Sequence, residues 1–498
     1  MRREPSGLTA RPLPPSMPAR WVYALSALHT AARDALGLPF GGAPPLPPDT
    51  AAQLRALLPS LREAPAGRLE YRVPLIAPMK AGKSTLINAL LCQDLLPARG
   101  PAMTILPTQV VPVTRQGTPE PVLTFTDATV AVLADIAGRL AAPDRRSALA
   151  AAVKRSPQLA QVATAIGGGP RPAPEAHRSG TRAVRRGLAE TNDLLRLALS
   201  VLQDSALPLI QLLRAPEVVV PVPWLEREPV GGWLVLVDTP GPDENLLPGV
   251  LNGFVAAEVV RAHELLLVAD ATRMEASAEA SVARLVDEAL VWPGRTGVRV
   301  VVNRVDMVPH LESTPAGRIA QPPSAELRSV LRRLTPARST AERTADPADH
   351  AVCTAARQAL EAATVLWPDP NPDPDAADPS GSARSAFLRT LFPLDADGEQ
   401  PPARDPGWVR DRASDAWRRS GVPYLLDSFL GACAEEPGRM AVRVLLDRLT
   451  QAVGTPDPAV AVTLPRKPLD VLALRKESVR ALVQGPDSTP GTDWSATG

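Results

Sequence analysis

The chain of 498 residues is poor in several residue types, and each scarcity excludes a class of protein. Its three cysteines lie too far apart in the sequence for a disulfide framework or a thiolate metal site. Its five histidines show neither an HExxH pattern nor a paired spacing, which argues against a catalytic zinc ion. It has no run near the ~18 consecutive apolar residues of a membrane-spanning helix, and no apolar stretch follows the basic residues at its start. We therefore expect a cytoplasmic protein.

An excess of charge of one sign is also lacking, because 54 Lys and Arg face 53 Asp and Glu. A formal net charge of +1 gives no long-range field that would attract nucleic acid, so we expect no nucleic-acid partner. Lysine itself is rare, since only five of those 54 basic residues are lysines and the other 49 are arginines. Two of the five, Lys80 and Lys83, lie three residues apart, which indicates a place where arginine would not serve.

Short apolar segments alternate with helical patterns in the middle of the chain. Strands are predicted at residues 69–78, 218–223, 233–237, 264–269 and 298–302, and helices at residues 84–92 and 276–290. Apolar runs of this kind are typical of parallel strands that are buried on both faces. The predicted fold class is α/β, a P-loop type of domain in which helices cover both faces of a mostly parallel sheet.

Composition also predicts how the chain is organised. The expected order is a disordered N-terminus at 1–16, N-terminal helices at 17–66, the sheet domain at 67–365 with a helical insertion at about 127–214, a Pro-rich loop at 366–407, C-terminal helices at 408–453, and a mostly disordered tail at 454–498 with one helix at 469–482.

Three finer expectations concern the helical parts. Thr50 is expected to N-cap a helix that ends at about Arg62. The insertion is expected to contain three helical runs, interrupted by the Gly- and Pro-rich residues 167–180. The C-terminal helices are expected to break at residues 420–423 and 435–438.

The clearest chemical motif is a phosphate loop of the form AxxxxGKS, from Ala77 to Ser84, between the first predicted strand and its helix. In such a loop, successive backbone N–H groups and a helix N-terminus bind phosphate oxygens. Lys83 would bridge the β- and γ-phosphates, and the Ser84 hydroxyl would ligate Mg²⁺. Lysine suits this place because it is a compact charge on a flexible stem.

A second motif, DTPG at residues 238–241, directly follows the apolar strand WLVLV. A carboxylate at the carboxyl end of a buried strand can reach the shell of the Mg²⁺ ion, which makes Asp238 a candidate ligand. The backbone N–H of Gly241 can contact the γ-phosphate. A plain turn after a strand would look the same, so this motif gains its meaning from the phosphate loop.

Two further segments predict selection of guanine, and the first of them follows the strand at 298–302. Asn303, Arg304, Val305 and Asp306 occupy an NKxD-like position with arginine in place of lysine. Asp306 can accept hydrogen bonds from N1 and N2 of guanine, a pair of donors that adenine does not present. Asn303 would tie the loops together, and the stem of Arg304 could stack on the base. Cys353, Thr354 and Ala355 resemble a loop whose backbone contacts guanine O6.

A threonine must complete the Mg²⁺ shell and position the attacking water, and two residues compete for this role. Thr104 and Thr108 both lie between the first and third motifs. We favour Thr104, because its Thr-x-x-Pro step, which ends at Pro107, resembles the first switch segment of a known GTPase family.

Together, KAGKSTLINALL, the Thr104-x-x-Pro107 step, DTPG and NRVD resemble the GTPase domain of the dynamin superfamily, specifically that of bacterial dynamin-like proteins. The resemblance covers about residues 67–365 and implies Mg²⁺-dependent hydrolysis of GTP, stimulated by dimerisation of the GTPase domains. The flanking helices would form a neck or bundle. The roughly 140 residues after the fifth motif suffice for a neck and not for a long stalk.

The expected site follows from these motifs. Nucleotide contacts are expected from Ala77, Met79, Lys80, Ala81, Gly82, Lys83, Ser84, Thr85, Gly241, Asn303, Arg304, Asp306, Cys353, Thr354 and Ala355. Mg²⁺ ligands are expected at Ser84, Thr104 and Asp238, and catalytic roles at Lys83, Thr104 and Lys80.

Lys80 needs a separate argument, because the residue after DTPG is Pro242 and its side chain cannot orient water. In some members of the superfamily a cation at the position of Lys80 stabilises the transferred phosphoryl group. A solvated loop lysine is the alternative for Lys80.

The leading hypothesis is therefore a GTPase that binds GTP and GDP and associates through its GTPase face, as a homodimer or with a longer dynamin-like protein, with peripheral membrane contact allowed. The alternative is a GTP-dependent switch or scaffold with little hydrolysis, the partner of such a longer protein. An ATPase is disfavoured by Asn303 and Asp306.

Overall fold

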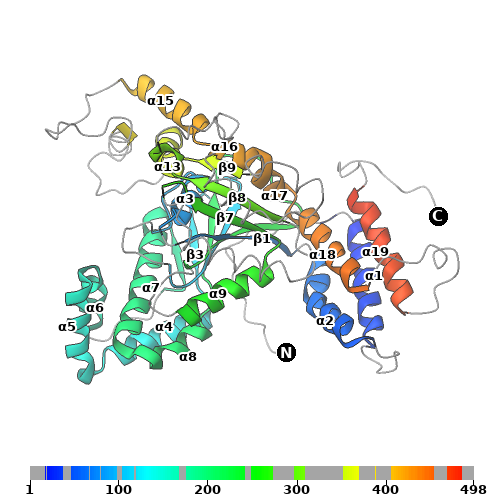
Figure 1. The fold of residues 1–498 in the computed structure, drawn as a ribbon, viewed down its shortest axis with the longest axis horizontal. Helices are drawn as coiled ribbons and strands as arrows, with labels where there is room; N and C mark the ends of the chain where they lie inside the picture. Colours follow the sequence, from blue (N-terminus) through cyan, green and yellow to red (C-terminus); the bar gives the residue numbers. More distant parts are fainter. Residues whose placement is uncertain are drawn as a thin grey trace.

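The computed structural model describes residues 17, 19–37, 46–66, 68–78, 80–97, 104–116, 119–167, 175–241, 248–272, 297–308, 351–369, 387–388, 405–453 and 468–484. Within this part of the chain, a central sheet carries helices on both faces, a helical insertion on one side and a helical bundle on the other (Figure 1). The helix predicted at 276–290 and most of the predicted loop at 366–407 lie outside the described residues.

The described part of the sheet has the strand order β4-β3-β5-β2-β6-β1-β7-β8-β9. The strands are β1 (Leu69–Ile76), β2 (Thr108–Val113), β3 (Val122–Thr124), β4 (His177–Ser179), β5 (Glu217–Pro221), β6 (Gly232–Asp238), β7 (Glu264–Asp270), β8 (Gly297–Asn303) and β9 (Ala351–Thr354). The pairs from β6 through β1, β7 and β8 to β9 are all parallel, whereas β2 pairs antiparallel with β6, and β3 pairs antiparallel with β4 and β5. The predicted α/β class is confirmed, with a mixed sheet.

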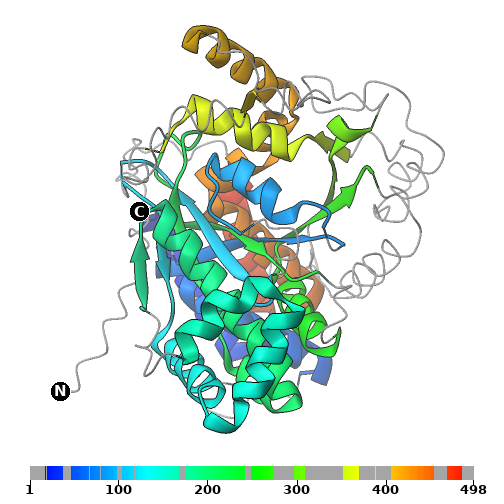
Figure 2. The ribbon, with the colours of Figure 1, turned by 90° about the vertical axis from the view of Figure 1, so that its left-hand side faces the viewer.

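Side-chain alternation on the buried strands separates the two faces of the sheet. On β7, Leu265 and Leu267 pack toward α9 (Pro248–Arg261), whereas Leu266 and Val268 belong to the main core on the other face. That other face is covered by α3 (Lys83–Leu91) and by α13 (Ala356–Leu366), which pack against each other (Figure 2). Since both faces are apolar, the strands contain continuous hydrophobic runs, as the sequence predicted.

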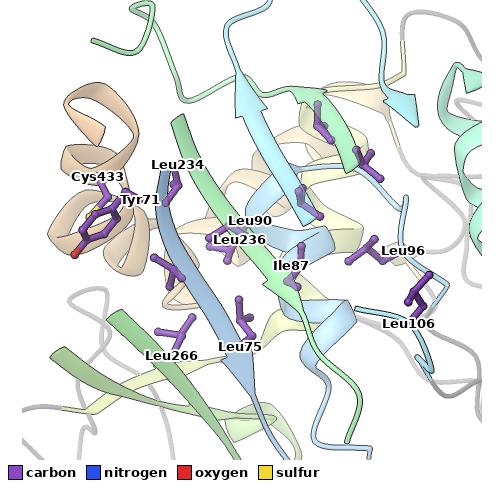
Figure 3. Close-up of a cluster of buried hydrophobic side chains, with 14 of the residues drawn as sticks. Tyr71, Leu75, Ile87, Leu90, Leu96, Leu106, Leu234, Leu236, Leu266 and Cys433 are labelled. Carbon is purple, nitrogen blue, oxygen red and sulfur yellow. The ribbon is translucent and has the colours of Figure 1, made fainter. Parts of the chain in front are cut away.

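Helix α3 is fixed by this core, and with it the phosphate loop that precedes it. Ile87 and Leu90 of α3 lie against Leu75 of β1 and Leu236 of β6, and all four are fully buried (Figure 3). Each such side chain contributes about 1.5 to 3 kcal/mol by burial. The strand–loop–helix unit is therefore anchored on both sides of its loop.

The insertion is helical, but its described part contains five α-helices in place of the expected three runs. They are α4 (Asp127–Leu140), α5 (Arg146–Arg155), α6 (Ala160–Gly167), α7 (Thr181–Leu202) and α8 (Leu207–Leu212). Short 3₁₀ turns that begin at Pro143 and Pro157 divide the first run, because proline favours the first turn of a helix and interrupts a continuous one. The interruption near residue 180 also contains β4, which pairs with β3.

Four helices from the two ends of the described chain form a bundle beside the sheet (Figure 1). They are α1 (Ala19–Ala35), α2 (Pro48–Glu63), α18 (Pro437–Val453) and α19 (Pro468–Gln484). Helix α1 packs against α2 and α19, and α18 packs against the same two. The expectation for Thr50 is wrong, because α2 begins at Pro48 and its N-cap is Pro47. The helix expected in the tail is present as α19, with Leu472, Val479 and Val483 buried.

The chain passes from the sheet domain to the bundle through a series of short helical segments. These are α15 (Pro406–Arg419), α16 (Val422–Leu425), the π-helical segment Leu426–Leu430 and α17 (Gly431–Glu435). The predicted breaks at residues 420–423 and 435–438 are confirmed. None of the described helices combines the length and apolar character needed to cross a bilayer.

Candidate functional site

The phosphate loop runs directly into a helix N-terminus, as its sequence predicts. Lys80 and Gly82 both adopt a left-handed conformation, with φ of 67° and 88°, and α3 begins directly afterwards at Lys83. Glycine is required at position 82 because a β-carbon there would collide with the side-chain Nδ2 of Asn303. Such a turn into a helix N-terminus can bind an anion. Met79, another expected nucleotide contact, lies outside the described residues.

The three expected Mg²⁺ ligands lie together. The Ser84 hydroxyl donates a hydrogen bond to Asp238 Oδ2 over 2.9 Å, and the Thr104 hydroxyl donates to the same oxygen over 3.1 Å. Asp238 is 2% exposed, and its other oxygen, Oδ1, is buried and has no hydrogen-bond partner among the described residues. Burial raises the pKa of Asp238, and the charge of Lys83 and the two hydroxyl bonds oppose this rise.

These residues fit a magnesium ion. Hydroxyl and carboxylate oxygens are the ligands that Mg²⁺ prefers, and Ser84, Thr104 and Asp238 supply both kinds at one place. A buried carboxylate oxygen without a partner costs free energy unless a cation or a donor reaches it. The orphaned Oδ1 of Asp238 is therefore an observation that favours a cation at this position.

The structure distinguishes the two threonines. The hydroxyl of Thr104 reaches Asp238, whereas Thr108 is the first residue of β2 and is paired with Asp238 through the sheet register. The segment that carries Thr104 is also held by the insertion, because the side-chain oxygen of Asn192 on α7 accepts a hydrogen bond from the Ile105 backbone over 2.9 Å. The insertion thus contacts the candidate site directly.

The DTPG turn is tied to the strand that leads into the phosphate loop. The hydroxyl of Thr239 donates to the Leu75 carbonyl of β1 over 2.6 Å. Gly241 is buried and lies at the end of this described segment, and Pro242 lies beyond it. The carboxyl ends of β1 and β6 are therefore held side by side, which brings Ser84 to Asp238.

Asn303 connects three loops, as the sequence predicted for it. Its Nδ2 donates to the carbonyl of Ala81 in the phosphate loop over 3.0 Å. Its Oδ1 accepts from the Thr354 hydroxyl over 3.2 Å and from the Ala356 backbone over 3.1 Å. The phosphate loop and the ends of β8 and β9 are thus one hydrogen-bonded unit.

The other residues of the guanine motif are placed around this unit. Arg304 has φ of 64°, and its Nη1 lies 2.9 Å from Oδ2 of Asp270, the last residue of β7. Asp306 is exposed in the short 3₁₀ turn Val305–Met307. The Asp306 carboxylate is therefore accessible, one turn after the Asn303 unit.

The loop of Cys353, Thr354 and Ala355 is held from outside by the junction between α15 and α16. The Ala355 backbone donates to the Ser420 carbonyl over 2.8 Å. Gly421 has φ of 73°, and a β-carbon there would collide with the Cys353 carbonyl oxygen. The sequence predicted only a helix break at this junction, so its contact with the candidate site was missed.

No protein-family model matches the sequence. The curated relative matched is the clamp-binding protein CrfC of Escherichia coli, strain K12, at 32% identity over 246 residues, which are 48% of this chain and 32% of CrfC. The same identity and coverage hold for CrfC recorded for Escherichia coli without the strain. The chain therefore spans about a third of the length of the curated relatives that it matches.

Solved structures of an oligomerised bacterial dynamin pair, described as providing a mechanism for long-range sensing and tethering of membranes, are also similar. One match has a TM-score of 0.36 and 14% identity and covers 88% of this chain and 56% of the other. The second has a TM-score of 0.36 and 15% identity and covers 87% and 46%.

Proposed function

We propose that this chain carries a dynamin-like GTPase domain that binds Mg²⁺·GTP and hydrolyses its terminal phosphoanhydride bond. The observation that carries the proposal is the cluster at the end of β6. Asp238 is buried there with two hydroxyl donors on one oxygen, and its other oxygen has no partner among the described residues. This cluster lies next to a left-handed phosphate loop that runs into a helix.

Four side chains around the phosphates have separate roles in this proposal. Lys83 and the N–H groups at the start of α3 bind the β- and γ-phosphate oxygens. Ser84 and Asp238 hold Mg²⁺, which supplies charge neutralisation at the phosphates when bound. Thr104 contributes its hydroxyl to the same shell, and its backbone orients the attacking water.

Guanine is selected at the other end of the site. Asp306 accepts from N1 and N2 of the base, and the backbone of Cys353, Thr354 and Ala355 contacts O6. Support comes from Asn303, whose hydrogen bonds join this end to the phosphate loop. These hydrogen bonds would therefore fix the distance between the loop that binds the phosphates and the loops that bind the base.

Self-association belongs to the proposal, because Pro242 after DTPG cannot orient the attacking water, and a second GTPase domain would supply the missing catalytic group. Lys80 is exposed in the left-handed turn of the loop, where it can reach a phosphate or a second GTPase domain. Dimerisation across the nucleotide face would then raise turnover. A cytoplasmic location with peripheral membrane contact remains a further part of the proposal.

The test is GTP turnover per molecule at increasing protein concentration, with ATP as the control nucleotide. Lys83→Ala should lower turnover roughly 100-fold or more, because it removes a charge from the transferred phosphates. The matched control is Lys154→Ala, an exposed lysine on α5 of the insertion, which should leave turnover unchanged.

A specific activity that climbs with concentration would support catalysis stimulated by association. A flat rate near zero with tight GTP binding would contradict the hydrolase and favour a nucleotide-dependent switch. Equal turnover of ATP and GTP would contradict the assignment of guanine.

A further inference from the structure

Arginine replaces the usual lysine in the guanine motif, and its guanidinium is held by a residue outside every predicted motif. Arg304 Nη1 lies 2.9 Å from Asp270 Oδ2. The Asp270 side chain is 5% exposed, whereas that of Arg304 is 37% exposed. The charge of Arg304 is thus tied to a buried carboxylate while part of its side chain remains open to a ligand.

The Asp270 carboxylate is itself held in one orientation. Its Oδ1 accepts from the Thr272 backbone over 2.9 Å and from the Thr272 hydroxyl over 2.7 Å, which leaves Oδ2 for Arg304. The loop after β7 is joined to β8 as well, because the Ala271 backbone donates to the Asn303 carbonyl over 2.9 Å. The anchor for Arg304 is therefore rigid and belongs to the same unit as the phosphate loop.

Arg304 is fixed at both ends. Its backbone has the left-handed φ of 64°, which non-glycine residues rarely adopt, and its guanidinium is held by Asp270. Its Nε lies 3.9 Å from where a β-carbon on Gly82 would be, so the arginine extends beside the phosphate loop. A long side chain held in this way loses less rotamer freedom when a ligand packs on it.

We infer that Asp270 is a positioning residue for the guanine base. It holds the guanidinium of Arg304 as a flat platform beside Asp306. This inference rests on the proposed function, since it assigns a role at the same nucleotide site. A guanidinium is planar and stacks on aromatic faces, so an arginine that is held in place can cover a purine. Without Asp270 the guanidinium would be free to turn into solvent, and the base would lose its platform.

The test is Asp270→Asn, which keeps the shape and removes the charge. Affinity for GDP and GTP that carry a fluorophore on the ribose should fall about 5- to 20-fold, with KM for GTP raised and kcat within about twofold. Magnesium tripolyphosphate, which has no base, should compete as well as it does with the wild type. The matched control is Asp135→Asn, which removes an exposed ion pair with Arg139 on α4 and should change none of these values.

A double-mutant cycle separates positioning from general damage. Arg304→Ala should weaken GDP binding, and adding Asp270→Asn to it should cause no further loss. If Asp270→Asn lowers the melting temperature, Thr272→Val provides a milder variant that only loosens the carboxylate, with an expected loss of about two- to threefold.

Three outcomes would overturn the inference. They are unchanged GDP affinity in Asp270→Asn, an equal loss for tripolyphosphate, and additive losses in the cycle. In each of these the wild type still binds GTP, so the proposed function survives. A wild type that binds no guanine nucleotide would overturn both.

Discussion

The two ends of the central strands each bury a charged side chain, but the partners of these two side chains differ. At the amino end, Arg72 of β1 donates to Glu70 and to Glu258 of α9, each over 2.6 Å. At the carboxyl end, Asp238 of β6 is buried with hydroxyl donors on one oxygen, and in the described part of the chain nothing bonds its other oxygen. Arg72 is bonded by two carboxylates of opposite charge, and its Nε alone has no partner among the described residues, whereas Asp238 is bonded by hydroxyl donors that carry no charge.

The amino end also joins the sheet to the segments that lead to the bundle. Tyr71 donates to Glu264 over 3.0 Å, and Arg299 bonds the same carboxylate over 2.9 Å. The Arg299 guanidinium lies 4.3 Å from the centre of the Phe429 ring in the π-helical segment, and Cys433 of α17 lies beside Tyr71 (Figure 3). This end therefore has a structural role.

The pKa values follow the same contrast. Burial by itself would lower the pKa of Arg72, but the carboxylates of Glu258 and Glu70 raise it, so the charged form is stabilised. Burial raises the pKa of Asp238, so its charged form is strained without a cation. A buried charge that is paired with opposite charges stabilises a fold, and one whose burial outweighs the compensation around it indicates a binding site.

The largest expected effect comes from Asp238→Asn. Turnover of GTP should fall roughly 100- to 1,000-fold, because the carboxylate charge in the Mg²⁺ shell is lost. The nucleotide-free protein should be as stable as the wild type or more stable, since a strained buried charge is removed. Chemical denaturation without Mg²⁺ measures this.

The pH dependence checks the same residue. The folded pKa is raised above 3.8, so the stability of the nucleotide-free wild type should fall as the pH rises from 3.8 through the raised pKa. This contribution should be absent in Asp238→Asn. A mutant that is strongly destabilised at neutral pH would contradict an unanswered charge.

Glu258→Gln tests the opposite end of the sheet. Arg72 and Glu258 have side chains that are 4% and 7% exposed, and removing one partner of such a pair leaves a buried charge with too little compensation. The free energy of unfolding should fall by about 3 kcal/mol, as measured in urea. GTP turnover of the folded mutant should stay within about twofold of the wild type. A large loss of turnover without a loss of stability would contradict a purely structural role of the amino end.

His263 provides a smaller effect at the amino end. Burial, followed by the charges of Arg448 and Arg72, lowers its pKa to about 3 from 6.5. The neutral imidazole accepts from the Arg72 backbone over 3.1 Å, so stability should be lost as the pH falls from 6.5 toward 3. The slope from this one group is up to about 1.4 kcal/mol per pH unit.

Acid-induced unfolding of His263→Asn measures this contribution against the wild type. Because carboxylates also titrate in this pH range, the contribution of His263 is the difference between the unfolding curves of the wild type and the mutant. Identical slopes between pH 4 and 6 would show that His263 is protonated in the folded protein.

The smallest expected effect concerns the insertion. Asn192→Ala removes the hydrogen bond to the Ile105 backbone and should loosen the segment that carries Thr104. GTP turnover should fall about 5- to 10-fold with GDP affinity unchanged, since one hydrogen bond is lost from the catalytic step. Single-turnover kinetics and GDP titration measure the two quantities, and a parallel loss of GDP affinity would contradict the role.

The sequence predicted the parts of the site that are local in the chain. The phosphate loop, DTPG and the guanine motif each follow an apolar strand directly, so strand prediction places them at one edge of a sheet. The predicted α/β class was confirmed. The sequence did not predict β3 and β4, because three residues are too few to show a periodic pattern. It did not predict β2 either, because Pro112 lies inside that strand and proline is rare in central strands.

The missed residues act across the fold. Asp270 meets Arg304 from another strand, Asn192 reaches Ile105 from the insertion, and Gly421 supports Cys353 from beyond the sheet. These partners are 34, 87 and 68 positions apart in the sequence. No local pattern encodes such contacts, although Asp270 does end an apolar strand as Asp238 does.

In our proposal, the buried carboxylate of Asp238 at the carboxyl end of β6 belongs to a Mg²⁺·GTP site. The most direct measurement is GTP turnover at a fixed high protein concentration while Mg²⁺ is titrated, for the wild type, Asp238→Asn and Glu258→Gln. Turnover of the wild type and Glu258→Gln should rise with Mg²⁺ and saturate, and that of Asp238→Asn should stay near the baseline. Equal curves for the wild type and Asp238→Asn, or no GTP turnover at any Mg²⁺ concentration, would contradict the account.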